Sequence, residues 1–316
     1  MREVYIVDAV RTPVGRMGGT LKNTQAHEMG GLVCKALMER TGLAPELVEE
    51  VVIAQVKQNA VASNIARVCA LMAGFREEIP AYTLMMQCGS SLQSVNCAAN
   101  DIRCGDVDVA VAAGVFKDEI VPVVIPQRKK EPIVFDTDEQ PRATTMEGLA
   151  KLKPVFRTDG KGKVTAGNSC GRSDAGAALL LMSGEKVKEL GVKPMARIVA
   201  HAIVGVDPRI MGIGPVPAVR KVLEKAGLTL DDIGMIELNE AFAAQSLAVI
   251  RELGLDMAKV NVSGGAIAMG HPLGATGGRI LTTLVHGMKR TRTRYGIATL
   301  CMGGGQGGAT LLELAD

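Results

Sequence analysis

The chain of 316 residues contains no tryptophan, only three tyrosines and only five phenylalanines. Proteins that bind single-stranded nucleic acid use aromatic side chains as stacking platforms, and such side chains are scarce here. The formal net charge of +3 is small, and the basic residues are scattered along the chain. We therefore expect no nucleic-acid partner, because nucleic-acid-binding proteins gather positive charge on one face.

Histidines, close cysteine pairs and long apolar runs are also lacking. The chain has four histidines, and its seven cysteines, an odd number, form no CxxC pair. This pattern speaks against a disulfide framework and against a structural zinc site. No apolar stretch is long enough to cross a bilayer, and residues 1–8 read as a strand rather than as a signal peptide. We expect no metal, no membrane contact and a reducing, cytoplasmic location.

What the chain does contain is a repeated pattern of strands and helices. An apolar content of 47% with balanced charge suits a globular α/β protein. Residues 41–53 resemble residues 226–238, at an offset of 227 − 42 = 185, and residues 108–114 resemble residues 295–301, at an offset of 295 − 108 = 187. Two such halves, paired about a pseudo-twofold axis, would bring equivalent turns together at the carboxyl ends of parallel strands.

The middle of the chain breaks this repeat. Residues 116 to 194 are rich in polar residues, and we expect an excursion from the core that ends in a helix from Ala175 to Leu190. We therefore expect three parts: an N-terminal half over residues 1–115, a middle segment over residues 116–194 and a C-terminal half over residues 195–316.

Cys88 lies where an apolar run changes into a helical pattern. Residues 81–86 read as a buried strand, and apolar residues at helical spacing follow until Gly105 ends the helix. A thiol at a helix N-terminus lies among unpaired N–H groups, which favour the thiolate. The alternative for an isolated cysteine is a buried, inert side chain.

Three further stretches place polar chemistry at the ends of predicted strands. They are residues 237–243 with Asn239, the glycine-rich residues 264–277 with His271, and residues 301–308 with Cys301. Taken singly, each has a structural explanation, such as a helix cap or a satisfied histidine. Together with Cys88 they supply a thiolate, a base, a second proton-transfer group and N–H donors for an oxyanion, which is what thiol-based nucleophilic catalysis needs.

Four ordered motifs resemble those of the thiolases: residues 88–90, 239–242, 270–272 and 301–303. Residues 10–15 and 206–215 are similar to the same family, and the likeness covers nearly the whole chain. The resemblance implies two duplicated βαβαβαββ halves in a five-layered αβαβα arrangement, with a loop domain between them. It also implies an acyltransferase that makes or cleaves short-chain 3-ketoacyl-CoA, such as acetoacetyl-CoA, from acetyl-CoA and CoA without any cofactor.

The resemblance further implies a role for each motif. Cys88 becomes acylated with His271 as its base, and Cys301 removes a proton from the second acetyl-CoA for the Claisen condensation. One oxyanion hole combines His271 with a water held by Asn239, and the other uses N–H groups of Cys88 and Gly303. By position in the motif, Ala241 and Phe242 line the substrate site.

The chain departs from the family pattern after Val115, where it passes directly to residues that resemble a much later point of that pattern. Several tens of residues are absent, so we expect a shortened loop domain and, without a tetramerisation loop, a homodimer. The expected CoA contacts are Arg142, Ser169 and Cys170, and Ser91 stands where the family usually has glycine. Two alternatives stay open: an inactive or impaired homologue that serves as a dimeric scaffold, and a thioesterase that uses Cys88 and His271 alone.

Overall fold

The computed structural model describes residues 1–57, 60–112, 119–157 and 159–315. The elements of the N-terminal half are β1 (Val4–Arg11), β2 (Gly15–Arg16), α1 (Ala26–Thr41), β3 (Glu50–Ala54), α2 (Ile65–Met72), β4 (Ala81–Leu84), α3 (Ser90–Cys104) and β5 (Val109–Ala112). The middle segment holds β6 (Val123–Gln127), β7 (Lys130–Phe135), α4 (Met146–Ala150), β8 (Ser173–Asp174), β9 (Ala177–Ser183) and α5 (Gly184–Leu190). The C-terminal half contains β10 (Ala196–Gly205), α6 (Pro215–Ala226), β11 (Met235–Leu238), α7 (Ala243–Leu253), α8 (Ala266–Met269), α9 (Thr276–Thr291), β12 (Tyr295–Met302) and β13 (Gln306–Leu314).

The order of the strands confirms the internal duplication. Within the described residues, nine strands form one sheet in the order β11-β12-β13-β10-β1-β9-β5-β3-β4. From the centre of the sheet toward its edges, both halves have the same strand order: β1, β9, β5 and β3 of one half match β10, β13, β12 and β11 of the other. The two halves meet where β1 pairs antiparallel with β10, through Tyr5 opposite Arg197. The pseudo-twofold axis therefore passes between these two strands.

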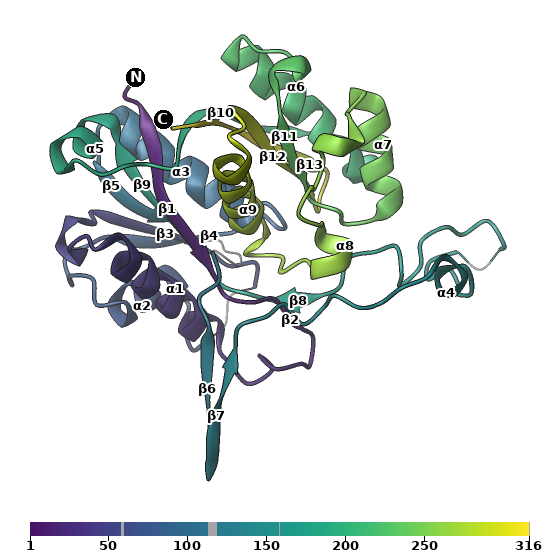
Figure 1. Ribbon diagram of the computed structural model, residues 1–316, viewed down its shortest axis with the longest axis horizontal. Helices are drawn as coiled ribbons and strands as arrows, with labels where there is room; N and C mark the ends of the chain where they lie inside the picture. The colour runs from purple at the N-terminus through teal and green to yellow at the C-terminus, as the bar shows by residue number, and fades with distance from the viewer. Residues whose placement is uncertain (58–59, 113–118, 158, 316) are drawn as a thin grey trace.

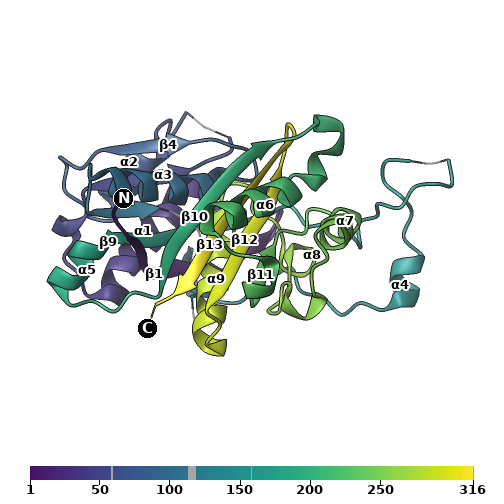
Figure 2. The ribbon, with the colours of Figure 1, turned by 90° about the horizontal axis from the view of Figure 1, so that it is seen from above.

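Helices cover both faces of each half, which gives the expected five layers (Figures 1 and 2). Helices α1 and α2 pack on the outer face of the N-terminal half, and α6 and α7 pack on the outer face of the C-terminal half. Helices α3 and α9 lie side by side in the central layer, between the two halves of the sheet. Since these two helices are the pseudo-symmetric partners that follow Cys88 and His271, the duplication brings those two turns together.

The middle segment leaves this core in two places. The hairpin β6–β7 projects from one end of the molecule, and the stretch around α4 extends sideways (Figure 1). The expected helix from Ala175 to Leu190 is wrong in its first half. Residues 177–183 form β9, which is completely buried between β1 and β5, and the helix begins only at Gly184. A strand that is buried on both faces has no alternating pattern, so its sequence resembles that of a buried helix.

The expectation that residues 81–86 form a buried strand is also wrong in part. Strand β4 ends at Leu84 and lies at the edge of the sheet, with Tyr82 and Met85 exposed to 38% and 58%. Edge strands that expose apolar side chains are surfaces on which another chain can add.

Candidate active site

Cys88 sits in a tight turn between β4 and α3. The preceding residue, Gln87, has a φ of +48°, which is unusual for a residue other than glycine. Its carbonyl oxygen accepts hydrogen bonds from the backbone N–H of Ser90 (3.1 Å) and from the Ser90 hydroxyl (2.6 Å). The N–H of Gly89 donates to the carbonyl of Met86 at 3.0 Å. These bonds fix the thiol of Cys88, half-buried, at the start of α3.

The environment of Cys88 corrects the expectation of a favoured thiolate. Burial raises the pKa of the Cys88 thiol, and the N–H of Gly303 opposes this by stabilising the charged form. Burial wins, so the helix N-terminus alone does not ionise the thiol. A base is therefore needed to take its proton.

Cys301 lies at the end of β12, close to the turn of Cys88. The following residue, Met302, packs against Gly89, where an added Cβ would come within 2.2 Å of the methionine methyl group. Cys301 is 1% exposed, and burial followed by the negative charge of Cys88 raises its pKa to about 12. The two thiols therefore share one electrostatic environment, and the charge state of one controls that of the other.

The hydrogen bonds of His271 define its tautomer. The Thr276 hydroxyl donates to the carbonyl of Pro272 at 3.0 Å, so at 2.6 Å it accepts the proton on Nδ1 of His271. Nε2 therefore carries the free lone pair, and it has no hydrogen-bond partner among the described residues. Burial followed by the positive charge of Arg279 lowers the pKa of His271 to about 4. At neutral pH this imidazole is an uncharged base.

Helices α3 and α9 meet at their N-termini, just after Cys88 and His271. An added Cβ on Gly277 would lie 2.1 Å from the backbone nitrogen of Leu92, so only glycine allows this approach. Ser91 of α3 accepts a hydrogen bond of 3.0 Å from the backbone N–H of Gly278 in α9. The turns that carry Cys88 and His271 are therefore joined through the first turns of the two central helices.

Asn239 follows β11 and is fully buried. Neither its amide oxygen nor its amide nitrogen has a partner among the described residues, as expected of a group that holds a water or a ligand. The neighbouring Glu240 accepts hydrogen bonds from Asn261 (2.9 Å) and from the backbone N–H of Ile267 (3.1 Å). Glu240 thereby anchors α8, which leads directly into His271.

Residues 168–172 connect these pieces. The N–H of Cys170 donates to the carbonyl of Ala241 at 3.2 Å, and the N–H of His271 donates to the carbonyl of Gly171 at 2.9 Å. Ser169 forms a strand-like bridge with Phe242. Burial, followed by the negative charge of Cys88, raises the pKa of Cys170 to about 11.

The expected residues are thus distributed as follows. Cys88, Cys301 and Gly303 lie together, and Cys170, Ala241, Phe242 and Ser169 lie along the adjoining segment. Arg142 lies on an exposed loop, and no contact of its side chain with the other site residues is seen in the described part of the chain. No group of three or more His, Cys, Asp or Glu side chains that could hold a metal occurs within residues 1–57, 60–112, 119–157 and 159–315.

Sequence reasoning missed three residues that support the site: Thr276, Arg279 and Glu237. The buried Arg279 lies 3.8 Å from the equally buried Glu237, and its charge helps to keep His271 neutral. Thr276 stands five residues after His271, at the start of a predicted helix, and only the fold shows that it contacts the imidazole. Ser91 is a departure from the family pattern in the sequence, and only the fold shows its contact with α9.

The strand ends of this duplicated α/β fold thus carry two cysteines and a neutral histidine, the kinds of group that thiol-dependent acyl transfer requires. Comparison with known proteins identifies the family. The sequence profile described as thiolase, C-terminal domain, matches residues 192–314, and that of the thiolase N-terminal domain matches residues 4–115 and 110–185. The chain belongs to the thiolase family.

Individual relatives agree with this assignment. An acetyl-CoA acetyltransferase of Pseudomonas aeruginosa is 44% identical over 392 positions, which cover 99% of each chain. The crystal structure of the Bacillus anthracis acetyl-CoA acetyltransferase superposes with a TM-score of 0.95 at 39% identity and 99% coverage of each chain. Human mitochondrial 3-ketoacyl-CoA thiolase in complex with CoA gives 0.94 at 34% identity, covering 99% of this chain and 98% of the other.

The comparisons also support the shortened middle segment. The alignment with the Pseudomonas aeruginosa relative has 392 − 316 = 76 more positions than the chain has residues. The N-terminal domain profile matches in two pieces that meet at residues 110–115, directly after β5. The relatives therefore have a segment at this point that this chain lacks.

Proposed function

We propose that this protein is an acetyl-CoA acetyltransferase that forms or cleaves short-chain 3-ketoacyl-CoA through an acyl-cysteine at Cys88. One observation carries the proposal: the turns of Cys88, Cys301 and His271 lie together, through the packing of Met302 against Gly89 and the hydrogen bond from Gly278 to Ser91. Relatives named acetyl-CoA acetyltransferase, 40–44% identical over nearly their full length, support the same activity.

In the first half-reaction, Nε2 of His271 takes the proton of the Cys88 thiol, and the thiolate attacks the carbonyl of acetyl-CoA. The imidazolium then donates Nε2–H to the developing oxyanion, together with a water held by Asn239. Preset donors of this kind contribute on the order of 3 kcal/mol each. The departing CoA thiolate takes a proton from Cys301, which leaves acetyl-Cys88 and a thiolate at Cys301.

In the second half-reaction, the Cys301 thiolate removes a proton from the methyl carbon of a second acetyl-CoA. The N–H groups of Cys88 and Gly303 stabilise the negative charge, and the carbanion attacks acetyl-Cys88 to form acetoacetyl-CoA. The displaced Cys88 thiolate recovers its proton from His271. Acylation favours this order, because it removes the negative charge of Cys88 that raises the pKa of Cys301.

For CoA itself, we propose contacts with Ser169 and Cys170, which border the site, and with Arg142 at the surface. The solved CoA complex of a family member supports CoA as a ligand of this fold.

We propose that no further cofactor takes part, that the protein acts in the cytoplasm, and that the three parts of the chain divide near residues 115 and 194. None of the described helices has both the length and the apolar character needed to span a membrane.

We also propose a homodimer, formed through the edge strand β4. Tyr82 and Met85 expose apolar surface at this edge, and Leu71 and Met72 are exposed on α2, which packs against β4. An edge strand with such neighbours is completed when a second copy pairs with it.

Replacement of Cys301 tests the catalytic assignment. The Cys301→Ala variant should still form acetyl-Cys88 from acetyl-CoA, while synthesis and thiolysis of acetoacetyl-CoA should fall by at least about a thousandfold, in line with the loss of a proton-transfer group. An unchanged overall rate would contradict the role of Cys301 and would favour a thioesterase that uses Cys88 and His271 alone.

The shortened middle segment favours one alternative, an impaired homologue that serves as a scaffold. Iodoacetamide labelling of Cys88 separates the two proposals. For an enzyme, we expect acetyl-CoA to reduce the labelling of Cys88. For a scaffold, we expect the same extent of labelling with and without acetyl-CoA.

A further inference from the structure

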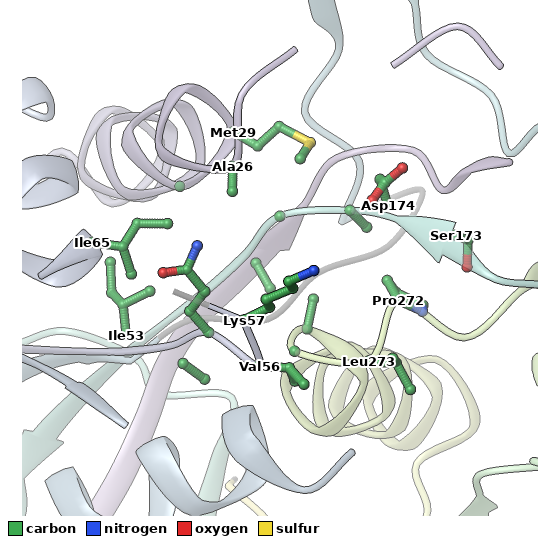
Figure 3. A pocket seen from close by; sticks show the side chains of 18 of the residues that line it. Ala26, Met29, Ile53, Val56, Lys57, Ile65, Ser173, Asp174, Pro272 and Leu273 are labelled. Carbon is green, nitrogen blue, oxygen red and sulfur yellow. The ribbon is translucent and has the colours of Figure 1, made fainter. Parts of the chain in front are cut away.

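Strand β3 has different surroundings at its two ends. At the carboxyl end, Ile53 and Ala54 line a cavity of about 310 Å³ beside His271 (Figure 3). At the amino end, Glu50 is only 8% exposed, although a buried carboxylate is costly without a cation beside it. Glu50 instead shares a hydrogen bond with a second carboxyl group, that of Asp101 on α3. Two carboxyl groups can share a hydrogen bond only while one of them holds a proton.

Within the described part of the chain, the charged groups that act on this pair of carboxyl groups are all acidic. Asp106, which follows α3, adds a negative charge, and Tyr82 of β4 contacts the pair. Strand β5, the other neighbour of β3, contributes only valine and alanine. Burial, followed by the negative charge of Asp101, raises the pKa of Glu50 to about 7, and burial also raises the pKa of Asp101. The pair therefore keeps a shared proton at pH values below about 7 and loses it above that pH.

Tyr82 connects the Glu50–Asp101 pair with the edge of the sheet. Its register partner is Val52, two residues after Glu50, so these three side chains point to the same face of the sheet. Helix α3 packs on that face. The Tyr82 hydroxyl donates to Asp101 at 3.5 Å, and Tyr82 is 38% exposed on the edge strand β4. A chain that pairs with β4 would cover Tyr82 and would move the two carboxyl groups further from water.

Helix α3 presents a polar stripe beside the same edge. Gln93, Cys97 and Asp101 follow one another at intervals of four residues and therefore share one face of the helix. All three are partly exposed, whereas most of the helix is buried. The Gln93 amide donates to the Cys97 thiol at 3.3 Å, and Cys97 in turn is hydrogen-bonded to Tyr82 of β4. The stripe extends the surface of β4, so we expect a partner that pairs with this strand to lie over the carboxyl pair as well.

We propose that dimer formation through β4 is coupled to protonation of the Glu50–Asp101 pair, and that the shared proton stabilises the dimer. The inference rests on the homodimer proposed above and adds its regulation by pH. Association moves the pair further from water, which disfavours a second negative charge, so the dimer holds the proton more tightly than the monomer does. The resulting stabilisation is complete below the pKa of Glu50 in the monomer, about 7, and is lost as the pH rises through the higher pKa in the dimer.

The test measures the dissociation constant of the dimer by analytical ultracentrifugation from about pH 6 to about pH 8.5, on both sides of the pKa of Glu50. We expect the constant to rise at least about tenfold over this range, because a shift of one pKa unit in each of two subunits corresponds to about a hundredfold. Asp101→Asn keeps the shape and an acceptor for Tyr82 but removes one acidic group, so its constant should change by less than about threefold. The control Asp231→Asn, at an exposed position of the C-terminal half, should keep the wild-type pH dependence.

The outcomes separate the coupling from the assembly. An unchanged dissociation constant over this range, or an equal change in wild type and Asp101→Asn, overturns the coupling and leaves the homodimer intact. A monomer at every pH overturns the proposed homodimer and the coupling with it. For a dimer too tight to dissociate, the rate of subunit exchange is compared at the same pH values and should follow the same trend. Acetylation of Cys88 is measured separately, so none of these results decides the proposed catalytic function.

Discussion

At the scale of single residues, the proposed chemistry depends on the proton of His271. Thr276 accepts from Nδ1 because its own proton is committed to the carbonyl of Pro272. This arrangement leaves Nε2 as the base. We predict that Thr276→Val, which keeps the shape and removes the acceptor, lowers the specificity constant for acylation roughly tenfold to a hundredfold.

The control for this prediction is Thr276→Ser, which keeps the hydroxyl and should retain most of the activity. Acylation by acetyl-CoA, followed by rapid quenching, is the measurement. Equal losses in the valine and serine variants would show that the methyl packing matters and the hydrogen bond does not.

A second histidine gives a pH dependence of stability. Burial, followed by the positive charges of Arg103 and Lys225, lowers the pKa of His201 to about 4, whereas the unfolded value is 6.5. The unfolded chain therefore binds the proton more tightly, and this contribution to stability is lost as the pH falls from 6.5 through 4. Urea unfolding should show that wild type loses more stability over this interval than His201→Gln, which cannot be protonated. Equal losses of stability in the two proteins would contradict the lowered pKa of His201.

Several residue roles were readable from the sequence, and others were not. Cys88, Asn239, His271 and Cys301 each follow a predicted strand, so their chain positions indicated a common edge. The predicted direction of the pKa shift of Cys88 is wrong, because a sequence shows the helix start and does not show the burial that outweighs it. Thr276 and Arg279 act through contacts that depend on how α9 packs.

At the scale of elements, the contact between α3 and α9 sets the geometry of the site. Helix α9 has no side-chain cap of its own, and Ser91 accepts the N–H of Gly278 in its first turn. We predict that Ser91→Ala lowers the free energy of unfolding by about 1 kcal/mol. The melting temperature should fall by roughly 1–2 °C.

Ser94→Ala is the matched control on the same helix, because its hydroxyl donates only to the carbonyl of Ser91 within α3. The two variants are compared by thermal unfolding and by the rate of acetyl-CoA turnover. The interhelical bond is unimportant if Ser91→Ala resembles Ser94→Ala in both measurements.

Element predictions from the sequence failed where burial removed periodicity. The helix α3 and its end at Gly105, which has a φ of +90°, followed from helical spacing and a glycine stop. The sequence predicts a helix where β9 lies, because all seven residues of this strand are buried and apolar or small. The sequence also predicts a buried β4, because an apolar strand does not show by itself that it lies at the edge of the sheet.

At the scale of the whole molecule, the duplication was the most reliable sequence feature. The matched offsets predicted two equivalent halves, and the strand order around the β1–β10 junction confirms them.

The proposed assembly is also a property of the whole molecule. We predict a mass near twice 33.1 kDa in light scattering. Tyr82→Glu, which places a charge on the exposed edge strand β4, should shift the protein toward the monomer. The exposed Leu247→Glu on α7 is the control and should leave the dimer intact. A tetramer, or a wild-type monomer, would refute the predicted assembly.

The central claim is that acyl groups pass through Cys88 and that Cys301 removes the proton that condensation requires. The most direct measurement is intact and peptide mass spectrometry of wild type and Cys301→Ala after brief exposure to acetyl-CoA. The account predicts one acetyl group on Cys88 in both proteins, which free CoA removes by reverse transfer, with acetoacetyl-CoA formed by wild type alone. An acetyl group on any other residue, or condensation by the variant at the wild-type rate, would contradict it.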